Sequence, residues 1–423
     1  MPSQSFNRRH FLTRAVAAGA LLTPGLIGRS AHAAEAILEP PFPLRKLTRG
    51  PKSHFFGYYD KCPWDATGRY LLGLEIGFCD RNPKPGEPLV LGLLDLENAA
   101  RFAPFDETTA WSWQQGTMLQ WMPNAPGREV IYNSVRDGAY VAIVRDVLAG
   151  TTRVLPQPIY AVSPDGKRAV TLPFDRLNRL RPGYGYMALP ERHKGIAAPE
   201  DAGIAVIDIA SGEHRLIIPI AWASRNKTDA RFTPDAEHWF NHLQFNPSGT
   251  RFLFLHRWSR PGTSGWQTRL YTARPDGSDV RLHADDGMTS HFDWRDDRTI
   301  LAWARVGKTD RFYLFNVDTN ESEVMGEGVL TRDGHCSYSP DRRWVLNDTY
   351  PDKEHMRTLM LYRPADARRI DIGRFHHPPQ LTGAFRCDLH PRWSRDGRQV
   401  CIDSAHDGAR QLYVIDVSAV VKG

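Results

Sequence analysis

The sequence predicts an all-β fold, a seven-bladed β-propeller whose last blade is closed by a strand from the N-terminal side. Three observations predict it: a short phrase that recurs along the chain, a second hairpin after each copy, and too few residues at the C-terminus for a complete last blade. Recurrence about every 40 to 55 residues is typical of folds that repeat a four-stranded unit around an axis.

Each of the four clearest copies of the phrase has a histidine, two further residues, an aromatic residue and a polar turn. Four copies lead with a histidine: His242, His291, His335 and His390. Three weaker copies upstream lead with another residue: Lys61, Met118 and Ile159. An apolar run follows every turn, and short apolar runs on both sides of a Pro, Asp, Gly or Ser turn indicate a β-hairpin.

A second apolar segment after each copy predicts the outer half of each blade. These segments are Val90–Leu96, Val141–Val147, Gly203–Ile209, Arg269–Ala273, Phe312–Val317, Thr358–Tyr362 and Gln411–Val417. After Val417 too few residues remain for a last outer strand, so Leu44–Thr48 is expected to fill that position. Closing the ring in this way removes the exposed edges that an open sheet would leave.

Residues 1–33 are predicted to be a twin-arginine export signal, which leaves residues 34–423 as one propeller domain. Arg8 and Arg9 precede a short apolar run and an A-x-A cleavage site that ends at Ala33. The apolar run is shorter than the roughly 20 residues of a membrane span. We therefore expect a periplasmic or secreted protein with no stable membrane span once the signal is removed.

The net charge argues against a nucleic-acid partner, and the cysteine content argues against a disulfide framework. The formal net charge is +6, and residues 1–33 hold four arginines and no acidic residue, so the remaining chain is close to neutral. It has no basic run with interleaved aromatic residues, which argues against a nucleic-acid partner. Five cysteines are an odd and sparse set for a disulfide framework.

Two long segments without strand pattern are expected at one face of the propeller. Pro173–Asp201 lies between the second and third strands of blade three, and Pro219–Asn241 leads into blade four. The first contains arginines and the turn Pro182–Tyr186, a composition that argues against disorder. It is predicted to form a lid or the wall of a groove, with a solvated loop as the alternative.

The four histidines share one position in successive blades, so they should line one arc of the central funnel at that face. Three imidazoles with an open position suit a divalent ion. His291, His335 and His390 are the predicted ligands, and Cys387 joins them through a C-x-x-H spacing. Zinc or manganese is favoured, with calcium as a further candidate. A structural histidine bonded to a neighbouring loop is the alternative for each.

Other residues at this face match β-elimination from a uronic acid. Neutralising the carboxylate acidifies the neighbouring C5 proton, a base removes that proton, and an acid protonates the leaving glycosidic oxygen. The candidate acids and bases are His242, Tyr58, Tyr184 and Tyr186, and the candidate carboxylate ligands are Arg179, Arg181 and Arg257. Packing for the tyrosines and surface ion pairs for the arginines are the alternatives.

With these residues in view, the chain resembles the propeller-type polysaccharide lyases, the ulvan lyases most and the oligogalacturonate lyases more distantly. The phrases that carry the resemblance are His54–Lys61, Arg181–Tyr186, Trp239–His242, Ser290–Phe292, Asp333–Cys336 and Arg386–Pro391. The resemblance implies seven blades, metal-associated histidines, a catalytic tyrosine in the Tyr184–Tyr186 loop and eliminative cleavage beside a uronate.

The chain departs from the ulvan lyases in its early blades. Where those enzymes have histidines, this chain has glutamine and asparagine, among them Gln115 and Asn133, which are expected to contact substrate. His54 or His242 is then expected to take the role of the missing histidine.

We therefore expect a lyase acting on an acidic polysaccharide or oligosaccharide, ulvan- or pectin-like. A non-catalytic periplasmic propeller of the TolB type, binding a glycan or a protein, is one alternative. A glycoside hydrolase is another, because Glu75, Asp348 and Asp403 end strands at the same face.

Overall fold

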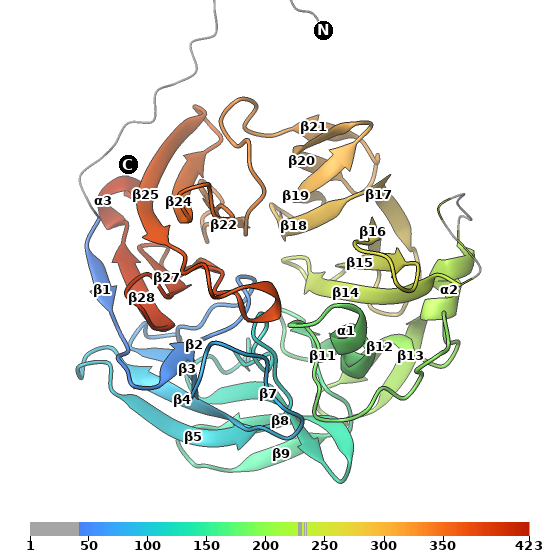
Figure 1. The fold of residues 1–423 in the computed structure, drawn as a ribbon, viewed down its shortest axis with the longest axis horizontal. Helices are drawn as coiled ribbons and strands as arrows, with labels where there is room; N and C mark the ends of the chain where they lie inside the picture. Colours follow the sequence, from blue (N-terminus) through green and yellow to red (C-terminus); the bar gives the residue numbers. More distant parts are fainter. Residues whose placement is uncertain (1–41, 227–230, 232, 234, 423) are drawn as a thin grey trace, which may run out of the picture. The chain divides into compact units, whose positions relative to one another are not determined.

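The computed structural model describes residues 42–226, 231, 233 and 235–422. In this part of the chain seven antiparallel sheets of four strands each are arranged as blades around one axis (Figure 1). The predicted seven-bladed β-propeller is thereby confirmed. The predicted export signal lies outside the described residues.

Blades one to six each use four consecutive strands. Blade one has β2 (Ser53–Phe55), β3 (Tyr70–Ile76), β4 (Leu89–Asp95) and β5 (Phe102–Thr108); blade two has β6 (Gln120–Trp121), β7 (Glu129–Arg136), β8 (Ala139–Asp146) and β9 (Thr152–Leu155). Blade three has β10 (Ala161–Val162), β11 (Arg168–Thr171), β12 (Gly203–Asp208) and β13 (His214–Pro219); blade four has β14 (Glu237–Phe245), β15 (Phe252–Ser259), β16 (Gln267–Ala273) and β17 (Arg281–Gly287). Blade five has β18 (Thr289–Trp294), β19 (Thr299–Val306), β20 (Thr309–Asn316) and β21 (Ser322–Val324); blade six has β22 (Ser337–Tyr338), β23 (Val345–Asp348), β24 (Met356–Arg363) and β25 (Arg368–His376).

Blade seven is built from both sides of the domain. Its strands β26 (Arg392–Trp393), β27 (Gln399–Ser404) and β28 (Gln411–Asp416) are completed by β1 (Leu44–Lys46). β1 pairs antiparallel with β28, with Leu44 opposite Ile415 and Lys46 opposite Tyr413. The closing strand predicted at Leu44–Thr48 is therefore present.

The aromatic residue of the recurring phrase joins neighbouring blades. The indole Nε1–H of Trp121 donates to the carbonyl of Pro63 in the preceding blade, and the Nε1–H of Trp294 likewise donates to Gln244 O. Both indoles are buried. A buried tryptophan needs a partner for its N–H, and here the partner is the backbone of the preceding blade. In these two copies the aromatic residue of the phrase therefore makes a contact between two blades.

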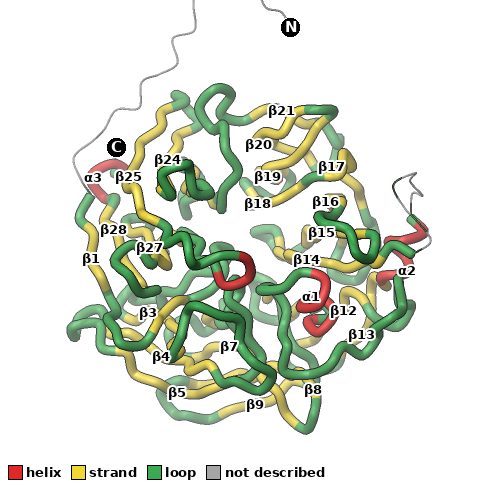
Figure 2. Tube along the Cα trace, in the orientation of Figure 1, coloured by secondary structure: helices red, strands yellow, loops and turns green. Residues whose placement is uncertain are grey.

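The helices are short and lie in the connections or, for the last one, after the final strand, as the red segments of Figure 2 show. They are α1 (Phe174–Leu180), α2 (Ile220–Arg225), α3 (Ser418–Val421) and the 3-10 helix η1 (Gly383–Phe385). Among residues 42–226 and 235–422, no helix has the length and apolar character that crossing a membrane requires.

Two segments that the sequence predicts to be irregular contain helices, which corrects that expectation. Pro173–Asp201 contains α1, and Pro219–Asn241 contains α2 and the first residues of β14. A seven-residue helix is too short to be stable alone, so its strength comes from packing. Phe174 and Leu177 of α1 are buried, and the buried Arg176 guanidinium donates to the carbonyls of the same connection.

Candidate functional site

Four histidines from four blades meet around two neighbouring tyrosines, Tyr58 and Tyr59. The ring centroids of His291 and His335 are 4.2 Å apart, and those of His335 and His390 are 4.5 Å apart. Tyr58 stacks on His242 at 4.8 Å and contacts His390 edge-on at 5.1 Å. Residues separated by up to 332 positions in the sequence therefore form one cluster, which we call the histidine cluster.

Irregular backbone aims these side chains into the funnel. His242 and His390 have positive φ values of 51° and 41°, a conformation that costs a non-glycine residue about 1–3 kcal/mol. His291 lies where the register between β18 and β19 shifts, between Thr289 and Phe292. A β-bulge breaks the alternation of side chains along a strand and re-aims the bulged residue.

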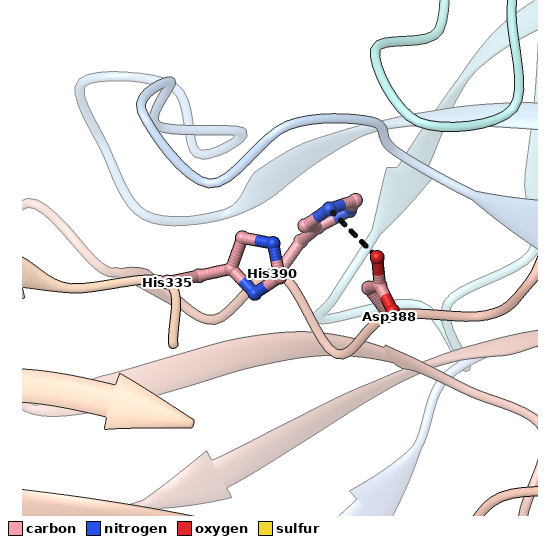
Figure 3. Close-up of side chains that lie close together, drawn as sticks. All are labelled: His335, Asp388 and His390. Atoms are coloured by element: carbon pink, nitrogen blue, oxygen red, sulfur yellow. Dashed lines mark ion pairs between the residues drawn. The ribbon is translucent and has the colours of Figure 1, made fainter. Parts of the chain in front are cut away.

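His335, Asp388 and His390 form a candidate metal group (Figure 3). One ligand atom from each lies within 4.8 Å of the others, and His390 Nε2 is 3.9 Å from Asp388 Oδ2. All three side chains are buried. Nε2 of both histidines and Oδ2 of Asp388 have no hydrogen-bond partner among the described residues. Three buried lone-pair donors without a partner fit a divalent cation.

Neighbouring carboxylates fix the orientation of the imidazoles. Asp348 accepts the Nδ1–H of His335 at 2.9 Å and its backbone N–H at 2.7 Å. With the proton on Nδ1, Nε2 presents its lone pair to the candidate metal group. Asp333 lies 2.8 Å from Nδ1 of His291. A carboxylate behind the imidazole is the usual arrangement in metal sites. His291 lies beside the candidate metal group rather than within it.

Two buried arginines keep Asp388 ionised. Arg357 Nη2 donates to Oδ1 at 2.7 Å. Arg386 Nε lies 2.7 Å from Oδ2, although its N–H is not aligned for a hydrogen bond. Burial acts to raise the pKa of Asp388, but Arg386 and Arg357 outweigh it and hold that pKa well below its usual value. The group therefore offers a deprotonated carboxylate oxygen as a ligand.

Two guanidiniums lie against Tyr184 and lower the pKa of its phenol. Arg386 Nη2 donates to its hydroxyl oxygen at 2.8 Å, and Arg181 Cζ lies 4.6 Å from its ring centroid. Burial acts to raise the pKa of Tyr184, but the positive charges of Arg386 and Arg181 prevail and that pKa lies below its usual value. The phenol of Tyr184 also contacts His242, with ring centroids 5.5 Å apart.

His242 is a neutral imidazole held by hydroxyls. Its Nε2 lies 3.3 Å from the hydroxyl of Tyr58, and its Nδ1 lies 3.1 Å from that of Tyr160 and 3.3 Å from Gln115 Nε2. Burial, followed by the charge of Arg257, lowers the pKa of His242 well below its usual value. Gln115 also donates to the hydroxyl of Tyr160, so the Tyr160 proton is directed to Nδ1 and the His242 proton is left on Nε2.

Arg181 and Arg257 form a cationic pair next to Tyr184. Their guanidinium carbons lie 4.3 and 5.3 Å from the Trp266 ring. No carboxylate of the described residues forms an ion pair with either, and Nε of each has no hydrogen-bond partner. Burial and the charge of Arg181 lower the pKa of Arg257 to about 10, so it stays charged at neutral pH. Two charged arginines without an acid are prepared for an anion.

The structure places several predicted residues outside this cluster. Arg179 pairs with Glu191 and, at 2.6 Å, with Glu237, so its charge is already neutralised. Tyr186 stacks on Phe174 at 4.2 Å and accepts a hydrogen bond from Asn133 at 2.8 Å. Tyr186 and Asn133 therefore serve the packing between blades two and three.

His54 and Cys387 are also placed elsewhere. His54 on β2 lies 3.0 Å from Gln411 and 3.1 Å from Glu75, in contacts that join blades one and seven. Cys387 packs with Leu381 and Ala405 and is not part of the candidate metal group. Burial raises the pKa of the Cys387 thiol to about 11, which keeps it protonated and a poor ligand.

Sequence reasoning missed Asp388, Arg386 and Trp266. Asp388 and Arg386 lie in a connection that folds back over the funnel, seen in Figure 1 as the red segment with η1 beside the axis. Gln114 Nε2 donates hydrogen bonds to the carbonyls of Ala384 and Arg386 and so holds this connection in place. The only available signal was the Asp-x-His spacing at 388–390, which is too common to assign a ligand.

No family model matches the chain, and no curated protein matches it. Among solved structures it is similar to an oligogalacturonate lyase in complex with manganese, with a TM-score of 0.65, 16% identity, and coverage of 90% of this chain and 94% of that one. An oligogalacturonate lyase from Vibrio parahaemolyticus gives a TM-score of 0.62, 14% identity, and coverage of 89% and 94%. A puromycin-hydrolyzing peptidase from Mycobacterium tuberculosis gives 0.53 and 13% identity, with 90% of this chain but 55% of that chain covered.

These likenesses place the chain in the class of β-propellers whose solved members include oligogalacturonate lyases. At such low identity they show the fold alone. The predicted resemblance to oligogalacturonate lyases is thereby confirmed for the fold, whereas that to ulvan lyases stays a prediction.

Proposed function

We propose that this protein is a metal-containing lyase that cleaves a uronate-containing glycan, ulvan- or pectin-like, by β-elimination. The observation that carries the proposal is the juxtaposition of an activated Tyr184, a neutral His242 and the unpaired arginines Arg181 and Arg257 in one site. Elimination needs a base, an acid and a cation for the carboxylate, and these residue types meet that need.

The substrate carboxylate binds between Arg181 and Arg257. Their charges draw electron density toward the carboxylate and stabilise the negative charge that develops when C5 loses its proton. Tyr184 takes this proton at its hydroxyl oxygen, since the neighbouring guanidiniums favour its deprotonated form. The C5–H bond breaks and the C4–C5 double bond forms.

Tyr58 protonates the leaving oxygen as the C4–O bond breaks. Burial, together with the neighbouring Tyr184, raises the pKa of Tyr58 well above its usual value, so it carries a proton at neutral pH. The Nε2–H of His242 lies 3.3 Å from the Tyr58 hydroxyl oxygen, which leaves the hydroxyl proton free to be donated. Exchange with water returns Tyr184 and Tyr58 to their starting states.

His335, His390 and Asp388 would hold the metal of this proposal. Two imidazoles and one carboxylate favour manganese or zinc over calcium, which prefers an all-oxygen shell. A bound divalent ion supplies positive charge that stabilises anionic groups of the substrate. The manganese in the similar oligogalacturonate lyase supports this choice. The proposal includes export through residues 1–33.

A substrate panel tests the proposal. Ulvan, pectate, glycosaminoglycan and alginate are incubated with metal-loaded protein, and the ultraviolet absorbance of the new double bond is followed with mass spectrometry of the products. At least one uronate-containing glycan is expected to give an unsaturated product. Tyr184→Phe should lower kcat by a factor of about 10² to 10⁴. His242→Asn, which tolerates the positive φ, should lower it with the fold retained. Absence of both unsaturated products and new reducing ends with every glycan would refute the proposal.

A further inference from the structure

Two connected hollows extend outward from the histidine cluster over blade six. The inner one, about 490 Å³, is lined by Asp333, Tyr350 and Lys353, among others. The outer one, about 420 Å³, continues over β23 and β24. Both are lined by Arg332 and Asp352, so they form one depression, which we call the blade-six groove. Each volume is in the range of small-molecule sites.

The inner end of the blade-six groove touches the histidine cluster. Asp333, in its wall, lies 2.8 Å from Nδ1 of His291. Tyr350, in the same wall, has its ring centroid 6.0 Å from those of both His291 and His335. A chain molecule whose reacting unit lies at the histidine cluster can therefore continue into the groove.

The acidic residues of the blade-six groove are already paired. Asp333 faces His291, Asp352 accepts from Arg374 at 3.0 Å, and Asp371 accepts from Arg369 at 2.7 Å. Arginines therefore neutralise two of these carboxylates, Asp352 and Asp371, within the protein.

Two cations of the groove have no acidic partner among the described residues. Arg332 precedes the inner strand of blade six, and Lys353 lies in the connection between its second and third strands. Both are exposed, and neither side chain has an ion pair or hydrogen bond to a described residue. The lining of the whole groove thus has four cations, Arg332, Lys353, Arg369 and Arg374, against three carboxylates, Asp333, Asp352 and Asp371.

The floor of the groove offers groups for hydroxyls. Asn347 is 1% exposed and its Oδ1 has no hydrogen-bond partner among the described residues. Thr349 and Thr358 lie beside it in the lining. A buried acceptor without a partner carries a cost that a ligand hydroxyl can relieve.

We propose that the blade-six groove binds the sugar units next to the cleaved one, with Arg332 and Lys353 contacting an anionic group of those units. That group is a carboxylate or a sulfate ester, which share the chemistry that the two cations recognise. The inference rests on the proposed lyase function and adds that the substrate is an acidic chain longer than a disaccharide.

A length series tests the groove. kcat/KM is measured for di-, tetra- and hexasaccharides of uronates, in one series without and one with sulfate esters. The double variant Arg332→Gln/Lys353→Gln is expected to lose about tenfold on the hexasaccharide, equal to about 1.4 kcal/mol, and nothing on the disaccharide. The matched control is Lys167→Gln/Arg298→Gln, whose exposed residues lie in the hairpin turns of the opposite face. It should behave as the wild type.

The two series distinguish the anionic group: a loss in both identifies a carboxylate, and a loss confined to the sulfated series identifies a sulfate. Added salt should shrink the advantage of the longer substrates, because exposed charges are screened. An equal length dependence in wild type and double variant, or no length dependence at all, overturns the proposal.

A binding measurement separates failure of the groove from failure of the proposed reaction. If no glycan yields an unsaturated product, migration is compared in native gels that contain polygalacturonate or ulvan. Stronger retardation of the wild type than of the Arg332→Gln/Lys353→Gln variant supports the groove without catalysis, and equal retardation refutes it.

Discussion

Replacing Arg181 by glutamine should move the pH dependence of the reaction to higher pH. Tyr184 acts as a base only when deprotonated, so kcat/KM should rise with pH and level off above the pKa of this phenol. Arg181 is one of two guanidiniums that lower that pKa, with Cζ 4.6 Å from the ring centroid. Removing it leaves Arg386, whose Nη2 is 2.8 Å from the hydroxyl oxygen.

The expected size of the shift follows from the geometry. A positive charge within about 4–6 Å lowers the pKa of an acid by about 1–3 units, and the closer Arg386 stays in place. We therefore expect Arg181→Gln to raise the pKa of Tyr184 by about one unit, or 1.36 kcal/mol. On the rising limb this is about a tenfold loss of rate at a given pH, in addition to any loss from weaker carboxylate binding.

Two assays check this prediction. The pH profile of kcat/KM gives the pH at which the rate levels off. Without substrate, the ultraviolet absorbance of tyrosinate measures the deprotonation of the Tyr184 phenol directly. Arg192→Gln is the control, since Arg192 is an exposed arginine of the same connection whose partner is Asp201. A rising limb at the same pH in wild type and Arg181→Gln would show that Arg181 does not tune Tyr184, and the assignment of the base would fall with it.

Three further predictions follow. His390→Ala should lose the divalent metal while Cys387→Ser retains it, as elemental analysis would show; equal retention would end the assignment of the candidate metal group. Arg392→Leu should lower the free energy of unfolding by about 3–5 kcal/mol, because it leaves the buried Asp403, 2.9 Å away, without its cation; denaturant unfolding measures this, and a loss under 1 kcal/mol would contradict it. The stability should fall as the pH drops from about 6.5 to 4, because burial lowers the pKa of three histidines to about 4 whereas unfolded histidine binds a proton near 6.5. The three histidines are His238, His283 and His377. A urea midpoint of unfolding that does not change between pH 6.5 and 4 would refute this last prediction.

The blade count could be predicted because its signal is local. Each copy of the phrase encodes one hairpin, and copies such as that of Trp294 add a contact between blades. The closing strand followed from counting strands, and it pairs with β28 as expected. The shared register of the four histidines followed from the same periodicity, because equivalent positions of successive blades lie at equal distances from the axis.

The partners of the site residues could not be predicted, since they depend on contacts between distant segments. Arg179 and Arg181 look alike in the sequence, yet Arg179 is neutralised by Glu191 and Glu237, 12 and 58 positions away. Cys387 and Asp388 are neighbours, yet only Asp388 enters the candidate metal group. Whether Arg179 is neutralised and whether Cys387 or Asp388 enters the group depends on how two connections fold. These connections are not part of the repeated unit, so the repeat cannot predict them.

The pairing of β1 with β28 means that the first and last strands of the domain close the ring by pairing with each other. During synthesis, six blades can form from continuous chain, but the seventh stays a three-stranded sheet until β28 pairs with β1, a strand made long before. A peptidase that trimmed the N-terminal side past Lys46 would remove that strand and leave β28 as an open edge, whereas trimming that stops short of Leu44 would leave the ring sealed.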